Sequence, residues 1–357
     1  MMDYLILVIN PGSTSTKVAL YKNEEVLKEK TIRHAVKELK HFKTIIDQIY
    51  FRKSLILEFL KENKYTLKDI DVFVGRGGMT KPLSGGTYNI SEAMVEDLSS
   101  LKYGDHASAL GTILSFEFAK SYQKPAFTVN PVVVDEFEDI SRISGLKQIE
   151  RKSVFHALNH KAIAIKFAQS LNKTYEEINV VIAHLGGGIS VALHKKGRVV
   201  DVNNALGGDG PFSPERTGTI PTYPLVDICF SGKYTKEEVK KLLVGKGGIA
   251  SYLDTNDARI VEKRVLEGDE EAKLIFEAMA YTVVKAIGSM YFVAKGDVDG
   301  IILTGGIAYS KYFTTYIKKY IDPILKVTVY PGEDEMKALA EGSMRVMTGK
   351  EKAKEYL

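Results

Sequence analysis

The sequence predicts an α/β fold made of two similar domains, each with a mixed β-sheet and flanking helices. The chain has 357 residues, of which 45% are hydrophobic. Because a single core rarely grows beyond about 250–300 residues, two domains are expected. One order of elements also occurs twice, near residue 5 and near residue 180: a strand, a glycine-containing turn, further strands and then helices. Two such halves would face each other across a central cleft, where ligands usually bind.

The first half opens with a predicted buried strand. An apolar run over residues 5–9 stops at Asn10-Pro11-Gly12, which indicates a strand that enters a turn. Later elements are assigned from apolar runs for strands and from apolar residues at helical spacing for helices. They are strands at 17–20, 26–32, 70–74 and 125–129, and helical segments at 36–63 and 107–122.

The second half repeats this scheme from residue 180. The predicted strands are 180–183, 189–194, 198–202, 300–303 and 327–330, and the predicted helices are 273–294 and 335–347. The helix over 273–294 is apolar on most faces, so we expect it in the domain core rather than at an interface. We place the first domain at 1–152 plus 334–357, with the C-terminal helix packed back on it, and the second domain at 153–333.

Composition excludes several classes of function. There are 49 Lys and Arg residues against 45 Asp and Glu residues, and this near balance argues against nucleic acid or an anionic membrane as partner. The single cysteine, Cys229, excludes an intramolecular disulfide, and we expect it to be a buried structural thiol. The N-terminus lacks the basic region and cleavage site of a signal peptide, and no apolar stretch approaches the length of a membrane span. We therefore expect a cytoplasmic protein.

Three glycine-containing turns are candidates for nucleotide binding. Residues 10–17 read NPGSTSTK, where glycine permits close backbone approach and hydroxyls and Lys17 can bind phosphate oxygens. Residues 184–191 read HLGGGISV and place a second exposed backbone at the same point of the second half. Residues 302–308 read ILTGGIA, against which adenosine could lie. Each turn alone could equally be an ordinary polar hairpin or corner.

Cationic side chains beside flexible backbone are candidates for binding carboxylate or phosphate. Arg76 lies within Gly-Arg-Gly-Gly and Arg216 within Pro-Glu-Arg-Thr-Gly. Arginine suits bidentate contact with such anions, although an arginine flanked by glycine can also belong to a surface turn. Histidines fall near these segments, and a lone histidine is more often structural than catalytic. The histidines considered are His106, His156, His160 and His184.

Taken together, these segments resemble the butyrate kinases, within the acetate and propionate kinase family. The resemblance runs from residue 8 to about residue 342. It is carried by VINPGSTSTKVALY, VGRGGMTKPLSGGTY, GDHASALG, VNPVVVDEFEDISRISGL, FHALNHKAIA, IAHLGGGISVALHKKGRVVDVNNALGGDGPFSPERTGTIP, DGIILTGGIAYS and YPGEDEMKALAEG. The resemblance implies the ribonuclease H-like, actin-like ATPase fold shared with sugar kinases and heat-shock chaperone ATPases. It also implies ATP and ADP as nucleotides, Mg²⁺ as cofactor, a small carboxylate as substrate and a homo-oligomer.

The resemblance further implies roles for the matching residues. Phosphate contacts are implied for Asn10, Ser13, Ser15, Lys17, His184, Gly186, Gly187 and Gly188. Adenosine contacts are implied for Asp257, Arg259, Gly305, Gly306, Ile307 and Ser310. Acid-substrate candidates are Arg76, His106, Asn130 and Val132. Catalytic roles are implied for Asn10, Arg76, His160, Arg216 and Glu335, and contact with Mg²⁺ for Glu335 and Ser15, with Glu333 as the alternative to Glu335.

Two positions depart from the family pattern. Asn130 stands where an aspartate is usual, so Asp135 or water would have to take over its function. Ala258 stands where an aromatic residue is expected beside the adenine. Val132, Val133 and Val134 could line a pocket for the apolar tail of the acid, but a core strand would explain three valines equally well.

The implied reaction is reversible transfer of a phosphoryl group from ATP to a short-chain fatty acid, such as butyrate or isobutyrate. The carboxylate is already ionised at pH 7, so the enzyme needs no general base and works by positioning and electrostatics. The alternatives are a hydroxyl kinase of the sugar-kinase type, which would need a carboxylate base, and a nucleotide-switched binding protein of the same superfamily.

Overall fold

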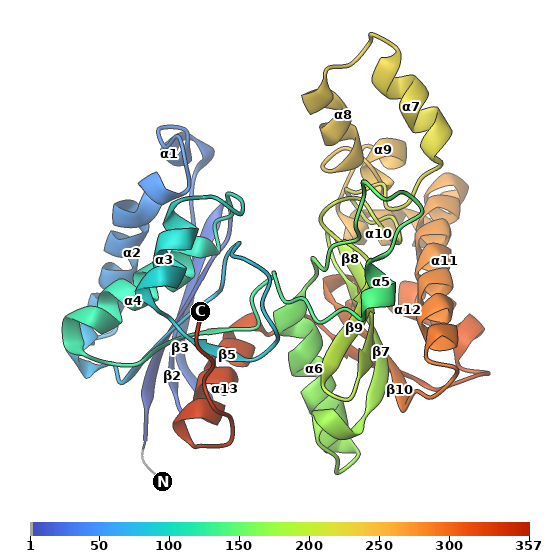
Figure 1. The fold of residues 1–357 in the computed structure, drawn as a ribbon. Coiled ribbons are helices and arrows are strands. Elements are labelled where there is room, and N and C mark those ends of the chain that lie inside the picture. The colour runs from blue at the N-terminus through green and yellow to red at the C-terminus, as the bar shows by residue number, and fades with distance from the viewer. Residues whose placement is uncertain (1–2) are drawn as a thin grey trace. The chain divides into compact units, whose positions relative to one another are not determined.

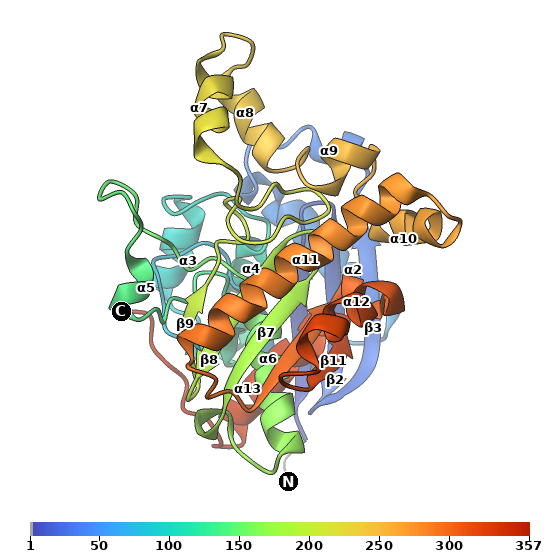
Figure 2. The same cartoon turned by 90° about the vertical axis from the view of Figure 1, so that its right-hand side faces the viewer.

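The computed structural model describes residues 3–357 and divides the chain into two compact units (Figures 1 and 2). The first unit is Met1–Val134 plus Asp334–Leu357, and the second is Asp135–Glu333. Residues 135–152, which we had placed in the first domain, therefore belong to the second unit. Backbone contact explains this difference, because the N–H of Glu138 donates to the carbonyl of Val200 at 3.1 Å.

The first unit contains a six-stranded mixed sheet. Its strands are β1 (Leu5–Pro11), β2 (Ser15–Lys22), β3 (Glu25–Arg33), β4 (Val72–Gly75), β5 (Thr87–Asn89) and β6 (Ala126–Val129). They lie in the order β3-β2-β1-β4-β6-β5. Strand β1 pairs antiparallel with β2 and parallel with β4, so the carboxyl ends of β1 and β4 lie side by side.

Helices cover both faces of this sheet. They are α1 (Val36–Leu39), η1 (Ile46–Gln48), α2 (Ile49–Glu62), η2 (Leu67–Asp69), α3 (Glu92–Ser99), α4 (Ala109–Tyr122) and α13 (Glu335–Met347). Helices α2 and α4 share one core with Leu7 and Leu20 of the sheet, through residues such as Phe59 and Phe118. Helix α13 contacts β1, β4 and β6 and lies on the other side of the sheet (Figure 1). The single helical segment predicted over 36–63 is interrupted between α1 and η1.

The second unit repeats the topology of the first. Its strands are β7 (Asn179–Leu185), β8 (Ile189–Lys195), β9 (Arg198–Val202), β10 (Gly300–Gly305) and β11 (Val327–Pro331). Their order, β11-β10-β7-β8-β9, matches β6-β4-β1-β2-β3 of the first unit, with the same parallel and antiparallel pairings. The predicted α/β fold with two similar mixed sheets is thus confirmed.

Helices also cover both faces of the second sheet. They are α5 (Asp139–Arg142), α6 (Ala157–Ser170), η3 (Tyr175–Glu177), α7 (Thr222–Phe230), α8 (Lys236–Leu243), α9 (Ile249–Leu253), α10 (Ala258–Leu266), α11 (Glu270–Val293), η4 (Gly306–Tyr309) and α12 (Lys311–Ile321). Helix α11 buries Phe276, Val283 and Ile287 against the sheet, as expected for a core helix. Phe292 and Leu274, however, stay 76% and 67% exposed, so its outer face is free of core contacts.

Helix α7 projects away from the sheet of its unit (Figure 2). None of its residues is buried, although it is one of the most apolar helices of this unit. Tyr223 and Phe230 are 87% and 86% exposed. Cys229 lies in this helix and is exposed, so our prediction of a buried thiol was wrong. An apolar sequence normally indicates burial, and α7 departs from that rule because it lies outside the core of its unit. Within residues 3–357, no helix is both long and apolar enough to cross a membrane.

Candidate functional site

Three predicted catalytic residues meet at the carboxyl ends of β1 and β4 in the first unit. The register that pairs Ile9 with Gly75 brings Asn10 and Arg76 together. The Nδ2 of Asn10 donates to Oε2 of Glu335 at 2.8 Å, and a terminal nitrogen of Arg76 donates to the same oxygen at 2.7 Å. The Arg76 and Glu335 side chains are 21% and 11% exposed, so this ion pair is largely, but not fully, removed from solvent. Arg76 can therefore still bind an added anion.

Glycine is required where the Arg76 segment meets α4. A Cβ on Gly75 would lie 2.1 Å from the carbonyl oxygen of Gly111, so a side chain there would force the two segments apart. This packing places His106 near Arg76. Nδ1 of His106 accepts from the backbone N–H of Ser108 at 3.2 Å, which leaves the ring proton on Nε2. Burial, and then the charge of Arg76, lower the pKa of His106, so its ring is held neutral.

The turn between β1 and β2, which the sequence predicts to bind phosphate, is open to solvent. Ser13 and Lys17 are exposed and Ser15 is half-buried. The turn closes through the N–H of Gly12, which donates to the carbonyl of Ser15 at 2.8 Å. These hydroxyls and the lysine are thus placed on one hairpin between β1 and β2, as the sequence predicted.

Asn130 performs a local structural function. Its φ of 40° lies in the left-handed region, which Asn tolerates. Its Oδ1 accepts from the N–H of Gly86 at 2.7 Å. Asp135 does not replace an aspartate here, because both of its carboxylate oxygens bind Arg142, at 2.7 and 2.8 Å. Val132 is half-buried, whereas Val134 is fully buried, so of these two only Val132 can contact a ligand.

Arg216 packs directly on the second glycine turn. A Cβ on Gly188 would lie 2.0 Å from a terminal nitrogen of Arg216, so only glycine admits the guanidinium there. That guanidinium donates to the carbonyl of Ala205. Its Nε is buried and makes no hydrogen bond with any described residue. A buried donor without a partner is costly, but the Arg216 side chain as a whole is 17% exposed, so an anion can still approach its other atoms.

His184, at the end of β7, is held by two neighbours. Its Nδ1 lies 2.9 Å from Oδ1 of Asn159, and since an amide oxygen only accepts, Nδ1 carries the proton. Its Nε2 lies 2.9 Å from Oε1 of Glu333, but the pair is not aligned as a hydrogen bond. Glu333 faces the second unit's histidines, whereas Glu335 faces Arg76 in the first.

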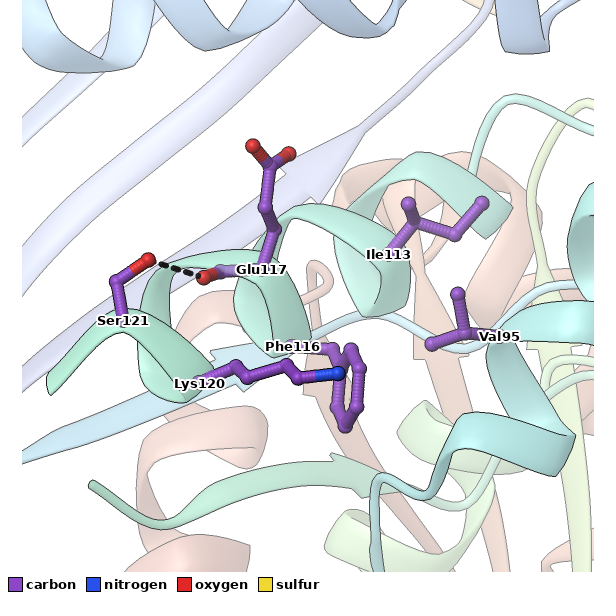
Figure 3. Close-up of a pocket in the computed structure, with 6 residues that line it drawn as sticks. All are labelled: Val95, Ile113, Phe116, Glu117, Lys120 and Ser121. Carbon is purple, nitrogen blue, oxygen red and sulfur yellow. Dashed lines mark hydrogen bonds between the residues drawn. The ribbon is translucent and has the colours of Figure 1, made fainter. Parts of the chain in front are cut away.

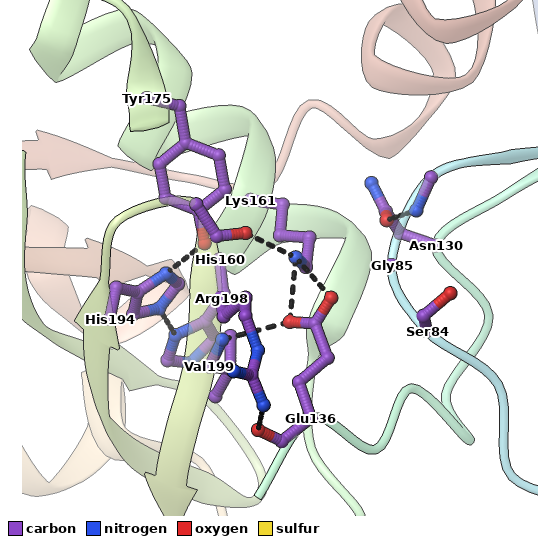
Figure 4. A network of polar contacts seen from close by, with 12 residues as sticks. Ser84, Gly85, Asn130, Glu136, His160, Lys161, Tyr175, His194, Arg198 and Val199 are labelled. Atoms are coloured by element: carbon purple, nitrogen blue, oxygen red, sulfur yellow. Dashed lines mark hydrogen bonds and ion pairs between the residues drawn. The ribbon is translucent and has the colours of Figure 1, made fainter. Parts of the chain in front are cut away.

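Four histidines lie close together around Ser190 in the second unit, and Figure 4 shows two of them, His160 and His194. Oγ of Ser190 lies 2.8 Å from Nε2 of His160 and 2.9 Å from Nδ1 of His156. Nδ1 of His160 lies 3.3 Å from His194, which in turn bonds the hydroxyl of Tyr175 (Figure 4). The pKa values of His160 and His194 fall well below their ordinary value, in both cases mainly because of burial.

Burial separates the roles of two of these histidines. His160 is 0% exposed, so no atom of it reaches a ligand in this structure. His156 is half-buried and stacks on His184 with ring centroids 3.8 Å apart. The geometry therefore does not fit the predicted contact between His160 and a phosphoryl group. His156, which the sequence also offered, is the accessible member of the pair.

The predicted adenosine residues begin where β10 ends. Gly305 has a φ of 89°, and a Cβ on it would lie 2.5 Å from the carbonyl oxygen of Leu185, so this turn lies against the end of β7. Nothing lies within 4 Å of a Cβ built on Gly306, which leaves its backbone open. Ile307 is 8% exposed. Ser310 caps α12 and donates to Glu262 of α10 at 2.6 Å, which joins the two segments.

Asp257 and Arg259 bind each other at the start of α10. Asp257 accepts from Nε of Arg259 at 2.9 Å and from its backbone N–H at 2.9 Å. These bonds lower the pKa of Asp257 to about 2. The Arg259 side chain is 90% exposed, so its outer surface is open to a ligand. Ala258 packs against the core of the second unit.

A separate hollow lies on the first unit between α3 and α4, with a volume of about 330 Å³ (Figure 3). It is lined by Val95, Ile113, Phe116, Glu117, Lys120 and Ser121. The charges beside it are already paired, Lys120 with Glu92 and Glu117 with Lys53. None of the predicted site residues lines this hollow.

A search of curated proteins places the chain among known enzymes. It is 51% identical over 355 residues to butyrate kinase 2 of Clostridium acetobutylicum, and the match covers 99% of this chain and 100% of the relative. The chain belongs to the acetokinase family. The family model itself matches residues 144–318. As a member of the acetokinase family the chain is a phosphotransferase with a carboxyl group as acceptor, which confirms the reaction class predicted from the sequence.

Solved structures of the acetokinase family share the fold. An acetate kinase from Porphyromonas gingivalis matches with a TM-score of 0.78 at 17% identity, covering 96% of this chain and 100% of that one. A propionate kinase from Francisella tularensis matches with a TM-score of 0.74 at 19% identity, covering 95% and 98%. The Lmo2764 protein of Listeria monocytogenes, a proposed N-acetylmannosamine kinase, matches with a TM-score of 0.54 at 13% identity, covering 97% and 99%. These likenesses confirm the predicted kinase fold.

Proposed function

We propose that the enzyme catalyses butyrate + ATP = butyryl phosphate + ADP in both directions, with branched acids such as isobutyrate as further substrates. Butyrate is the acid named for the relative at 51% identity over the whole chain. The cluster of Arg76, Asn10 and Glu335 supports a carboxylate acceptor, because it holds one partly exposed guanidinium with a single carboxylate partner. In this proposal the first unit binds the acid and contributes its turn at residues 12–16 to the phosphates, and the second unit binds the rest of the nucleotide.

The chemical step needs no general base, since the butyrate carboxylate is ionised near neutral pH. One carboxylate oxygen attacks the γ-phosphorus, the bond between that phosphorus and the β,γ-bridging oxygen breaks, and ADP leaves. The enzyme has to bring two anions together and stabilise the charge on the transferring group. Arg76 orients the carboxylate, and its bond to Glu335 fixes the guanidinium plane. Neutral His106 contributes an Nε2–H donor beside Arg76.

Stabilisation of the transferring phosphoryl group comes from the second unit. Arg216 offers the terminal part of its guanidinium, which lies against the glycine turn on a side chain that is 17% exposed. His156 takes the role that the sequence analysis gave to His160, and His160 supports it through Ser190. Backbone N–H groups of Gly187 and Gly188 contact the phosphate chain, while that of Gly186 donates to the carbonyl of Gly188 at 3.2 Å and shapes the turn. We keep Ser13, Ser15, Lys17 and His184 as phosphate contacts, and Asp257, Arg259, Gly305, Gly306, Ile307 and Ser310 as adenosine contacts.

Magnesium fits this donor set as a largely hydrated ion. Residues 3–357 contain no group of three or more acidic, histidine or cysteine side chains that could enclose a metal. Mg²⁺ usually keeps several waters and binds substrate phosphates plus one or two protein oxygens. Both bonds to Glu335 use Oε2, and the hydroxyl of Ser15 lies on the first phosphate turn. The bound ion would neutralise phosphate charge, and Glu335 and Ser15 would hold it through water.

The homo-oligomer and the cytoplasmic location also remain proposals. Self-association is supported by α7, whose nine residues include none that is buried. Light scattering coupled to size exclusion would measure the mass, and Phe230→Asp should reduce it if α7 lies in the interface. An unchanged mass would remove α7 from the interface.

Trapping of acyl phosphate with hydroxylamine tests the proposed reaction. The assay uses MgATP with acetate, propionate, butyrate, isobutyrate and isovalerate, and glucose as control. Product with butyrate or a branched acid and little with acetate supports the proposal and ranks the acids. No product with any acid, from folded protein that binds ATP, would overturn it and favour a hydroxyl kinase or a nucleotide-switched binding protein.

A further inference from the structure

The first unit contains a fully buried arginine beneath its phosphate turn. Arg52 lies on α2 and is 0% exposed, which makes it the largest fully buried side chain of the described residues. It shares the inner face of the helix with Ile56 and Phe59, which follow at spacings of four and then three residues. An arginine on such a face is unusual, because charged side chains are almost never fully buried unless they are paired.

All the hydrogen bonds of Arg52 go to neutral acceptors. Its Nε and one terminal nitrogen donate to Oε1 of Gln48 at 3.0 and 2.8 Å. The other terminal nitrogen donates to the carbonyl of Ser15 at 2.9 Å and to Oγ1 of Thr16 at 3.0 Å. The terminal nitrogen that bonds Gln48 also makes a longer contact of 3.4 Å with the carbonyl of Ser13. Among residues 3–357, no carboxylate forms an ion pair with Arg52.

The guanidinium is therefore well bonded but carries an unbalanced charge. Hydrogen bonds from neutral groups only partly replace the solvation that a buried cation loses, so an uncompensated buried charge destabilises a fold. The obvious remedy, a glutamate at position 48, is absent. Burial lowers the pKa of Arg52 to about 10, which leaves it charged at neutral pH.

We propose that Arg52 is a positioning residue whose missing counter-charge is the phosphate chain of the nucleotide bound at residues 12–16. This inference rests on the proposed function of that turn. The planar guanidinium of Arg52 holds the carbonyls of Ser13 and Ser15 toward the protein interior. Its positive charge attracts anions to the turn. The unbalanced charge lowers the stability of the ligand-free enzyme and is offset when phosphate binds.

His34 provides a way to observe this charge. Its Nε2 lies 2.9 Å from Oγ1 of Thr16, and this hydroxyl already accepts a bond from Arg52. Burial first, and then the charge of Arg52, lower the pKa of His34. Added negative charge beside Arg52 should raise that pKa.

Gln48→Glu is the decisive variant, because it has nearly the same shape and gives Arg52 an internal counter-ion. We expect the melting temperature of the ligand-free protein to be kept or raised. We also expect the Kd for MgATP and for pyrophosphate to rise by roughly tenfold or more. The affinity for adenosine should be unchanged, and the pKa of His34, measured by NMR, should rise. The matched control is Ser54→Glu, which adds the same charge on the exposed side of α2 and should change none of these quantities.

The outcomes separate a charge effect from a purely structural one. If Gln48→Glu binds MgATP and pyrophosphate as tightly as the wild type, Arg52 is only a clamp and the inference is overturned. Arg52→Lys, which keeps the charge but loses the fork, should retain more pyrophosphate binding than Arg52→Met. These experiments measure binding, so their outcome is independent of the trapping assay. Wild-type enzyme that makes no acyl phosphate would overturn the proposed function. Normal catalysis together with unaltered binding in Gln48→Glu would overturn only this inference.

Discussion

His160→Ala should mainly lower the stability of the protein, whereas His156→Ala should mainly lower its activity. His160 is fully buried, bonds Ser190 at 2.8 Å and meets His194 at 3.3 Å. Truncation of a buried ring costs about 3–5 kcal/mol. At about 2 °C per kcal/mol for a chain of this size, the melting temperature should fall by roughly 6–10 °C. Activity per folded molecule should fall less than in the His156 variant.

His156→Ala should instead keep most of its stability and lose catalysis. Its ring is half-buried, bonds Ser190 at 2.9 Å and stacks on His184. A stability loss of about 1 kcal/mol is expected. Removal of one group that stabilises charge in a transition state lowers kcat by roughly 100-fold or more. Differential scanning fluorimetry and initial rates of acyl phosphate formation measure both effects.

A matched substitution makes this comparison stricter. His160→Gln can still hydrogen-bond Ser190 and should recover part of the stability lost in His160→Ala. The reasoning is refuted if His156→Ala keeps kcat within about threefold of wild type while a stable His160→Gln loses activity. That result would return the phosphoryl contact to His160 and would require the second unit to rearrange on ligand binding.

Further predictions concern the two arginines and the buried histidines. Arg76→Lys should raise the KM for butyrate by roughly tenfold or more with little change in melting temperature. Lysine can still pair with Glu335, but it cannot hold a carboxylate with two parallel bonds. An unchanged KM in steady-state assays at saturating MgATP would count against acid binding by Arg76. Arg216→Lys should lower kcat by about 100-fold and leave the KM for butyrate nearly unchanged, as measured by the same assay, whereas a change confined to KM would indicate a role in binding only. His160 and His194 have lowered pKa values in the folded state, so the unfolded chain binds more protons and stability decreases as pH falls through the ordinary value of about 6.5. Two such residues should lower the free energy of unfolding by about 3 kcal/mol between pH 7.5 and 5.5, and His194→Gln should remove about half of that slope in urea titrations; a flat profile would contradict burial of neutral histidines.

The repeated topology was predictable because its strands are continuous apolar runs. Strands β1, β7 and β10 are buried along nearly their whole length, which produces unbroken hydrophobic segments that end at Asn10, His184 and Thr304. Strand β5 was not predicted because it has three residues and takes its pairing from β6. The interruption between α1 and η1 was missed because apolar residues continue at helical spacing through it. Asp269 caps α11 by accepting from the N–H of Ala272, a signal that would have placed its start correctly.

The candidate site was predictable where a polar or charged residue comes directly after a buried strand. Asn10 and Arg76 were found because glycine and polar residues follow buried strands, and the parallel pairing of those strands brings the two residues together. The choice between His156 and His160 was not accessible from sequence, because both lie on one short segment and only tertiary packing decides which is buried. Arg52 left a signal that was not used: it interrupts the apolar face of a predicted helix.

Transfer of isotopic oxygen tests the central claim most directly. The enzyme is incubated with MgATP and butyrate labelled with ¹⁸O in both carboxylate oxygens, and the product is examined by ³¹P NMR and mass spectrometry. If the carboxylate attacks the γ-phosphorus, butyryl phosphate carries one ¹⁸O bonded to phosphorus, and ADP forms in equal amount only when butyrate is present. Formation of ADP without butyrate, or a phosphorylated product without ¹⁸O on phosphorus, would contradict the account.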